Sequence, residues 1–261
     1  ASFASNTITD QRGDILEATV EMTETSEATI SFGSDEDGVI ANATVEDDNG
    51  DDEVTVYINT YNFQDDNANV FSLDSDSDDV LLDQNQDNDN DGTSAEPQDG
   101  LGELLDAGDY DLEVQAGDQS VSTGVTQSDD VATVTLSERS TDTFRMWTGS
   151  KEAIGTGVSD LEDVTDALEE GQITQSNEVA VGDYAVHQLV ASGFEGALDA
   201  REDEDVTTAF GTLNSSGPIN LTIEEADPGA NQDAQELDLS YGDNVTVIAD
   251  GPNEPYSVIV D

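Results

Sequence analysis

Apolar and polar residues alternate with a period of two along most of this chain, which is the pattern of half-buried β-strands. The first such run places four apolar side chains on one face: Leu16, Ala18, Val20 and Met22. Further alternating runs follow in both halves of the chain, at 28–32, 132–136, 219–223, 237–241, 245–249 and 256–260. Short strands separated by turn-like segments are typical of β-sandwiches.

The strongest local signal is Asn49-Gly50, which lies between two alternating runs. This dipeptide is typical of a two-residue hairpin turn, because both residues accept a positive φ. A turn centred there pairs residues whose numbers sum to 99, so that Val45 faces Val54. Every inward residue then meets another inward residue, as a correct register requires. The pattern therefore predicts an antiparallel hairpin over 38–61.

A second motif places Asp106, Gly108, Tyr110 and Leu112 at alternate positions. This is the spacing of the tyrosine corner of immunoglobulin-like sandwiches, in which the tyrosine hydroxyl bonds to backbone a few residues upstream. A Gly-Asp turn before an ordinary strand is the alternative interpretation. The motif favours a first immunoglobulin-like β-sandwich domain over 1–138, with a long acidic loop at 72–100.

The second half adds a helical signal to the strand pattern. Ser159 and Glu162 form a capping box, and Gly171 supplies a C-terminal stop. Between them runs an apolar stripe that we interpret as core: Leu161, Val164 and Leu168. The sequence thus predicts a second β-sandwich over 139–261 with a short helical insertion near 159–170. The predicted fold class is mainly all-β, with two tandem immunoglobulin-like β-sandwich domains.

Charge separates two classes of protein that this pattern could belong to. The chain has 62 acidic residues against five basic ones, a formal net charge of −57. High net charge is typical of disorder, but it is also typical of proteins folded in brine. At about 4 M salt the Debye length is on the order of 1.5 Å, so self-repulsion is screened. Because the apolar residues are patterned, we expect a folded, salt-adapted protein.

The same charge excludes several partners. Phosphate binding needs clustered lysines and arginines, so neither nucleic acid nor an anionic lipid surface is expected. No segment approaches the ~20 apolar residues of a membrane span, so we expect no direct membrane insertion in this segment. No signal peptide is visible. Since the chain ends on a strand-like run, we expect a piece of a longer protein with its anchor downstream.

The acidic loop contains the candidate metal ligands Asp87, Asp89 and Asp91, followed by Gly92. This alternation matches the opening of a calcium-binding loop. The twelfth position is Gln98 rather than an acid, so a true EF-hand is not expected. A looser Ca²⁺ or Mg²⁺ site is one interpretation, and a solvated loop with diffuse counterions is the other. No organic cofactor is expected.

Four tripeptides match the N-glycosylation acceptor pattern, beginning at Asn42, Asn214, Asn220 and Asn244. Several would arise by chance in a chain rich in Asn, Ser and Thr. Three of the asparagines lie on the polar face of predicted strands, where a glycan would project into solvent: Asn42, Asn220 and Asn244. All four are candidate glycosylation sites.

Little in the sequence points to catalysis. The chain has no cysteine, and its single histidine, His187, lies mid-strand among apolar residues. We therefore expect His187 to be structural, since the chain has almost none of the cysteine and histidine residues from which nucleophile–base pairs are commonly built. Acids are so common that no pair is marked out for glycoside hydrolysis. The adhesion-like tripeptide at 12–14 is treated as chance, and no enzyme is predicted.

Taken with these motifs, the chain resembles the β-domain repeats of haloarchaeal S-layer and cell-surface glycoproteins. The resemblance is carried by the Ala-Gly-Asp-Tyr-Asp-Leu turn at 107–112, the acidic hairpin linking Thr-Val strands, and the Asn-Val-Thr sequon at 244–246. It covers nearly the whole chain. It implies extracellular tandem immunoglobulin-like domains, N-glycosylation, divalent-cation dependence and lattice assembly. The threonine-rich stalk and terminal anchor of that family do not occur in this sequence.

We therefore expect a non-catalytic structural module of the cell surface of a halophilic archaeon. Its partners would be neighbouring copies or other domains of the same surface protein, bridged by divalent cations across acidic faces. An adhesion or ligand-binding ectodomain that forms no lattice is the first alternative. An accessory β domain of a secreted hydrolase is the second.

Overall fold

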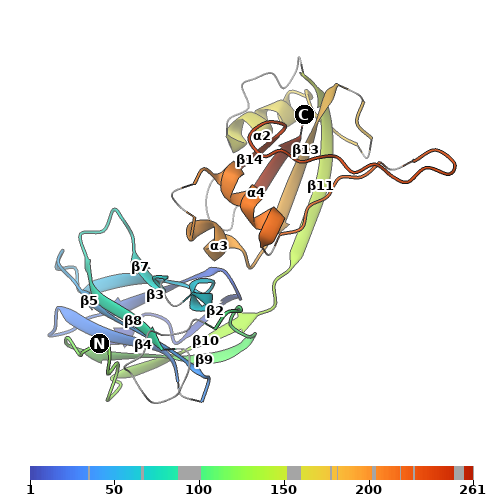
Figure 1. Cartoon of the computed structure of the whole chain (residues 1–261). Helices are drawn as coiled ribbons and strands as arrows, with labels where there is room; N and C mark the ends of the chain where they lie inside the picture. Colours follow the sequence, from blue (N-terminus) through green and yellow to red (C-terminus); the bar gives the residue numbers. More distant parts are fainter. Residues whose placement is uncertain are drawn as a thin grey trace. The chain divides into compact units, whose positions relative to one another are not determined.

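The computed structural model (Figure 1) describes residues 1–34, 36–65, 68–87, 101–151, 160–176, 178–180, 182–201, 204–217, 219–225, 227–249 and 256–260. The chain divides into two compact units. Unit 1 comprises Ala1–Arg139 and Glu195–Ala200, and unit 2 comprises Ser140–Phe194 and Arg201–Asp261. Strand accounts for 43% of the chain and helix for 13%, which confirms the mainly-β class.

Unit 1 is a sandwich of two sheets. The first sheet has the order β1 (Ser2–Phe3), β3 (Ile15–Glu21), β6 (Glu53–Asn59) and β7 (Phe71–Leu73). The second has the order β2 (Thr7–Gln11), β10 (Asp130–Ser137), β9 (Gly108–Ala116), β4 (Glu27–Ser34), β5 (Val39–Glu46) and β8 (Val80–Asp87). Neighbouring strands are antiparallel except β2 and β10, which run parallel. A short 3₁₀ helix, η1 (Asn62–Gln64), follows β6.

The core of unit 1 lies between the two sheets and is formed by the inward half of each alternating run. Along β3, for example, Leu16, Ala18 and Val20 are buried while Glu17 and Glu21 are exposed. The largest fully buried side chains include Phe32, Phe63 and Phe71. The period-two pattern therefore identified the inward face correctly.

The predicted 38–61 hairpin is wrong in its pairing. β5 pairs with β4 and β8 in the second sheet, whereas β6 pairs with β3 and β7 in the first. Asn49-Gly50 thus lies in a connection that crosses from one sheet to the other. The Asp47 carboxylate fixes this corner, because it accepts backbone N–H bonds from Gly50 (2.6 Å) and Asp52 (3.0 Å). Val45 and Val54 are both buried, as predicted, but on facing sheets.

The predicted tyrosine corner is confirmed. Tyr110 lies near the start of β9, and its hydroxyl donates a hydrogen bond of 2.8 Å to the backbone carbonyl of Asp106. Its ring stacks on Phe32 with centroids 5.3 Å apart. The corner therefore ties the turn before β9 to the core of the sandwich.

Unit 2 contains one antiparallel sheet with the order β12 (Thr174–Gln175), β11 (Thr141–Ser150), β13 (Asp183–Ala191), β15 (Tyr256–Val260) and β14 (Val245–Ile248). Helix α2 (Leu161–Glu169) packs on one face through a small apolar cluster: Val164, Ala167, Ile173, Val186, Ile248 and Ile259. Helix α4 (Val206–Ser216) packs against β14, where the Thr207 hydroxyl bonds both backbone groups of Val247.

The second half thus differs from the predicted second sandwich, because in its described residues helices take the place of a second sheet. The alternating runs at 219–223 and 237–241 form no strand in the described residues. Their flanking residues Glu224 and Glu236 form an isolated bridge, Tyr241 forms another with Val245, and the apolar side chains of both runs remain partly or fully exposed. The predicted helix is present. Its N-cap is Asp160, whose side chain accepts from the N–H of Asp163, and Ser159 lies outside the described residues.

Helix α3 (Glu195–Asp199) belongs to unit 1, although the chain on either side of it belongs to unit 2. It docks on the β2–β3 turn, where Gly196 N–H donates to the Gly13 carbonyl (3.0 Å). Asn59, at the end of β6, donates to the Gly196 carbonyl and to the Asp199 carboxylate, each at 3.0 Å. No sequence pattern had indicated this insertion.

Candidate functional site

The first candidate glycosylation site, Asn42, lies on the outer face of β5 but is buried, with 6% of its surface exposed. Its amide nitrogen, the atom that a glycan would occupy, donates to the Val121 carbonyl (2.9 Å) and to Asn85 Oδ1 (3.3 Å). Its amide oxygen accepts from the Ser31 hydroxyl (2.6 Å). The expectation that this side chain faces solvent is therefore wrong.

The cover over Asn42 is the segment 117–125, which connects β9 to β10 and lies against β4 and β5. Thr29 Oγ1 donates to the Gly117 carbonyl, and Thr44 Oγ1 to that of Gln119. Gly124 is buried with φ of +64°. A polar row on the outside of the second sheet thus serves as a docking surface for the chain's own loop, and is largely buried by it.

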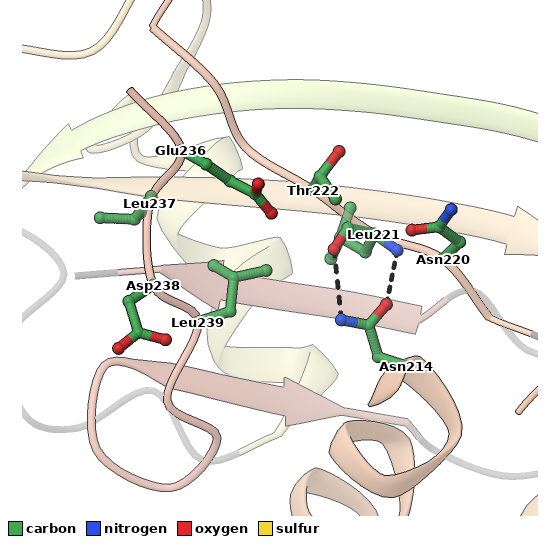
Figure 2. Close-up of a pocket in the computed structure, with 8 residues that line it drawn as sticks. All are labelled: Asn214, Asn220, Leu221, Thr222, Glu236, Leu237, Asp238 and Leu239. Carbon is green, nitrogen blue, oxygen red and sulfur yellow. Dashed lines mark hydrogen bonds between the residues drawn. The ribbon is translucent and has the colours of Figure 1, made fainter. Parts of the chain in front are cut away.

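The candidates Asn214 and Asn220 come together in unit 2 (Figure 2). Asn214, near the end of α4, uses both ends of its amide on the backbone of Leu221: its nitrogen donates to the carbonyl (3.2 Å), and its oxygen accepts from the N–H (2.5 Å). Leu221 is the middle residue of the Asn220-Leu221-Thr222 sequon. Asn214 therefore holds the neighbouring sequon in place.

Asn220 itself is exposed, and no hydrogen bond joins its amide to another described residue. It lines an open pocket of about 510 Å³ together with Asn214, Leu221, Thr222, Glu236, Leu237, Asp238 and Leu239. Leu239 is partly exposed and points between Glu236 and Asn214, whereas Leu237 is 42% exposed with its side chain pointing away from Asn220. The pocket combines an apolar surface with two exposed carboxylates, Glu236 and Asp238.

The fourth candidate, Asn244, is half-buried just before β14. Its nitrogen donates to the Asp238 carbonyl (2.9 Å), and its oxygen accepts from the N–H of Ser240 (2.7 Å). Like Asn42 and Asn214, it uses its amide within the fold. The structure therefore separates Asn220 from the other three sequon asparagines.

Only one of the three candidate metal ligands lies in the described part of the chain, so the structure does not test this site. Asp87 is the last residue of β8, and Asp89 and Asp91 lie outside the described residues. Elsewhere in the described part of the chain, no three acidic or histidine side chains converge on a position suited to a metal ion. A Ca²⁺ or Mg²⁺ site at Asp87, Asp89 and Asp91 stays a prediction.

A buried carboxyl lies where α3 docks on unit 1. Burial, then the neighbouring carboxylates of Asp14, Asp10 and Asp199, raise the pKa of Glu195 from 4.5 to about 7. Its Oε2 atom is buried and has no hydrogen-bond partner among the residues that the structure describes. Asp14 is 2% exposed and accepts from the N–H of Glu195 (3.2 Å). The adhesion-like tripeptide at 12–14 is therefore part of an internal contact, in line with its interpretation as chance.

His187 is structural in its surroundings, as expected. It is 5% exposed on β13 and stacks on Phe144, with ring centroids 5.2 Å apart. Burial lowers the pKa of His187, and neither ring nitrogen has a hydrogen-bond partner among the described residues.

Some features of these sites escaped sequence reasoning. The role of Asn214 depends on a contact with Leu221 across a helix end, and that of Asn42 on a contact with Val121, 79 residues later. No short-range pattern records such contacts. No helix in the described part of the chain has both the length and the apolar content needed to cross a membrane.

Comparison with known proteins gives relatives along the whole chain. A family model described as a domain of unknown function (DUF7827) matches residues 1–117. A cell surface glycoprotein of Haloferax gibbonsii is 38% identical over 259 residues, which is 99% of this chain and 26% of that protein. Cell surface glycoproteins 1 and 2 of Haloarcula hispanica are 35% and 34% identical over the entire chain.

The chain spans 29% of each Haloarcula protein, so it corresponds to somewhat more than a quarter of its curated relatives. The similarity extends through both units, whereas the family model covers only part of unit 1. No solved structure matches the chain significantly.

Proposed function

Because the chain is related over nearly its whole length to the cell surface glycoproteins of haloarchaea, we propose that it is a non-catalytic structural module that assembles with neighbouring copies through cation-bridged acidic faces. Its location is the extracellular cell surface. The single observation that carries the proposal is this full-length similarity, since it includes both the sandwich and the helix-bearing unit. The relatives' names support a structural rather than an enzymatic role.

The surface chemistry supports bridging by cations. The net charge of −57 leaves acidic faces that repel one another until counterions intervene. Carboxylate oxygens are the ligands that Ca²⁺ and Mg²⁺ prefer. In molar monovalent salt, long-range repulsion is screened, but a divalent ion shared between two carboxylates still adds a direct bond between copies.

Assembly can be tested with the purified chain in about 3 M NaCl, a salt concentration at which the Debye length is under ~3 Å. Adding Ca²⁺ is expected to produce large, ordered particles, measured by light scattering and electron microscopy, and chelation should reverse it. The control adds NaCl of equal ionic strength. A chain that stays monomeric with every divalent cation would instead be an adhesion or ligand-binding ectodomain, and the assembly proposal would fail.

A further inference from the structure

The four sequons differ in whether the amide nitrogen of the asparagine is hydrogen-bonded within the fold, and this difference matters for modification. N-glycosylation replaces a hydrogen on the amide nitrogen with a sugar, which is bulky and must project from the surface. In Asn42, Asn214 and Asn244 that nitrogen donates to carbonyl or amide oxygens of the fold. Asn42 uses both amide hydrogens, so a sugar there must break at least one of these bonds and would expel the loop at 117–125. On Asn214 or Asn244 a sugar would compete with the one bond that the nitrogen makes.

Asn220 differs from the other three asparagines, because its amide makes no hydrogen bond to another described residue. It is exposed on an extended segment, and the hydroxyl-bearing residue of its sequon, Thr222, is exposed as well. The segment between them is held by Asn214, whose amide bonds both backbone groups of Leu221 (Figure 2). The acceptor and its threonine are therefore presented to solvent on a fixed backbone.

We propose that Asn220 is the glycan acceptor of this chain and that the first sugar lies in the adjacent pocket. This inference rests on the proposed function, because only an exported surface chain meets a glycosyltransferase. The pocket has about 510 Å³ of space beside the Asn220 side chain. That is large enough for one or two sugar rings, by comparison with the ~300–1,000 Å³ of small-molecule sites.

The lining fits a neutral pyranose. The carbon face of a sugar ring is apolar and would cover the partly exposed side chain of Leu239, which points between Glu236 and Asn214 in Figure 2. Its hydroxyls are donors, and the carboxylates of Glu236 and Asp238 are acceptors at the rim. The same two carboxylates would repel an acidic sugar, so we expect the first residue of the glycan to be uncharged.

The acceptor assignment is tested by expressing the chain in a haloarchaeal host and analysing its peptides by mass spectrometry. A glycopeptide containing Asn220 is expected, with Asn42, Asn214 and Asn244 unmodified. The variant Asn220→Gln should lose the glycan mass, whereas the matched control Asn244→Gln should retain it. A glycan on another sequon with Asn220 bare, or no glycan at all, would overturn the assignment.

The position of the sugar is tested by comparing the thermal unfolding of the glycosylated chain with that of Asn220→Gln, each with and without Leu239→Asp. The glycan should raise the melting temperature of the parent chain, and this rise should shrink in the Leu239→Asp background. An equal rise in both backgrounds would show that the sugar does not use the pocket. Neither result depends on divalent assembly, so failure here leaves the proposed function intact, and failure of assembly leaves the glycan assignment intact.

Discussion

At the scale of single residues, unit 1 is specified by buried polar groups as much as by its apolar core. Asn42, Ser31 and Thr44 lie on what an alternating pattern marks as the solvent side, yet all are buried under the loop at 117–125. A buried polar group is stabilising only when it is hydrogen-bonded, so this loop has essentially one position that satisfies them. Gly124 lies directly against Asn42 and Ser31, with no room for a side chain.

Replacing Gly124 by alanine should therefore destabilise unit 1 by about 3 kcal/mol or more, from left-handed strain and overpacking together. The new Cβ would overlap Asn42 Oδ1 and lie 2.8 Å from Ser31 Oγ. Gly38→Ala is the matched control, because Gly38 has φ of +71° but open space around its Cβ position. It should cost only the ~1–2 kcal/mol of the strained backbone. Equal losses in denaturant unfolding would contradict the close-contact account.

Glu195 predicts an unusual pH dependence for unit 1. Its pKa is about 7 in the folded chain and near 4.5 when unfolded. Between these values the folded state holds a proton that the unfolded state has lost, so stability falls as pH rises from about 4.5 to about 7. Glu195→Gln should remove this part of the pH dependence, measured by denaturant unfolding at constant high salt. A profile that keeps the same slope in Glu195→Gln would contradict the assignment. Asp199→Asn, at an exposed neighbour, should weaken the slope only slightly.

At the scale of elements, the sequence reveals faces better than partners. The alternation correctly marked Val45 and Val54 as inward, and the spacing before Tyr110 correctly predicted a tyrosine corner. Both are local properties, because side-chain direction and a four-residue hydrogen bond are set by neighbouring residues. The predicted partner of β5 was wrong because two inward residues such as Val45 and Val54 can meet either side by side in a hairpin or across the core from facing sheets.

The same limit applies to unit 2 and to the sites. A period of two at 237–241 predicts a strand only if something covers its apolar side, and here Leu237 stays exposed. The docking of α3 on Asn59 joins residues more than 130 positions apart. The sequons identified four asparagines, but burial and hydrogen bonding, which distinguish Asn220, depend on tertiary structure.

Engineered cysteines can test the strand pairing, since the chain has none of its own. Thr19 and Thr55 are directly opposed in β3 and β6, with hydroxyl oxygens 3.0 Å apart. Opposed residues have Cα atoms about 4.5–5.5 Å apart, within disulfide range. Thr19→Cys/Thr55→Cys should therefore oxidise to a disulfide in the native state, measured by mass spectrometry and gel mobility.

The matched control is Thr44→Cys/Thr55→Cys, which shares one cysteine and represents the alternative hairpin register. Thr44 and Thr55 lie on the outer faces of different sheets, on opposite sides of a sandwich about 10 Å thick. This pair should stay reduced in the folded chain. A rapid disulfide in the control pair and none in the Thr19 pair would instead support the 38–61 hairpin.

At the scale of the whole molecule, the charge dominates. Only five basic residues offset 62 acids, and the ion pairs of Arg12 with Asp106 (3.8 Å) and Glu138 (3.7 Å) are long and join it to exposed carboxylates. Such pairs contribute little. We therefore expect the fold to depend on screening by salt, in agreement with its relationship to surface proteins of haloarchaea.

Dilution of salt should then unfold the chain. Below ~0.5 M the Debye length exceeds about 4 Å, so neighbouring surface carboxylates repel one another again. We expect loss of the β signal in far-UV circular dichroism as salt falls through this range, with refolding when salt is restored. Sucrose, which favours compact states without screening charge, should be a poor substitute for salt.

A variant separates screening from a general salt effect on apolar burial. Replacing four exposed acids of unit 1 by their amides, at Asp48, Asp51, Asp74 and Asp76, removes charge without touching the core. If repulsion opens the chain, this variant should unfold at lower salt than the parent. If salt acts only by strengthening apolar burial, the two transitions should coincide, since the buried side chains are identical. Coincident transitions, or a parent chain that stays folded in dilute buffer, would remove repulsion as the reason for the salt requirement.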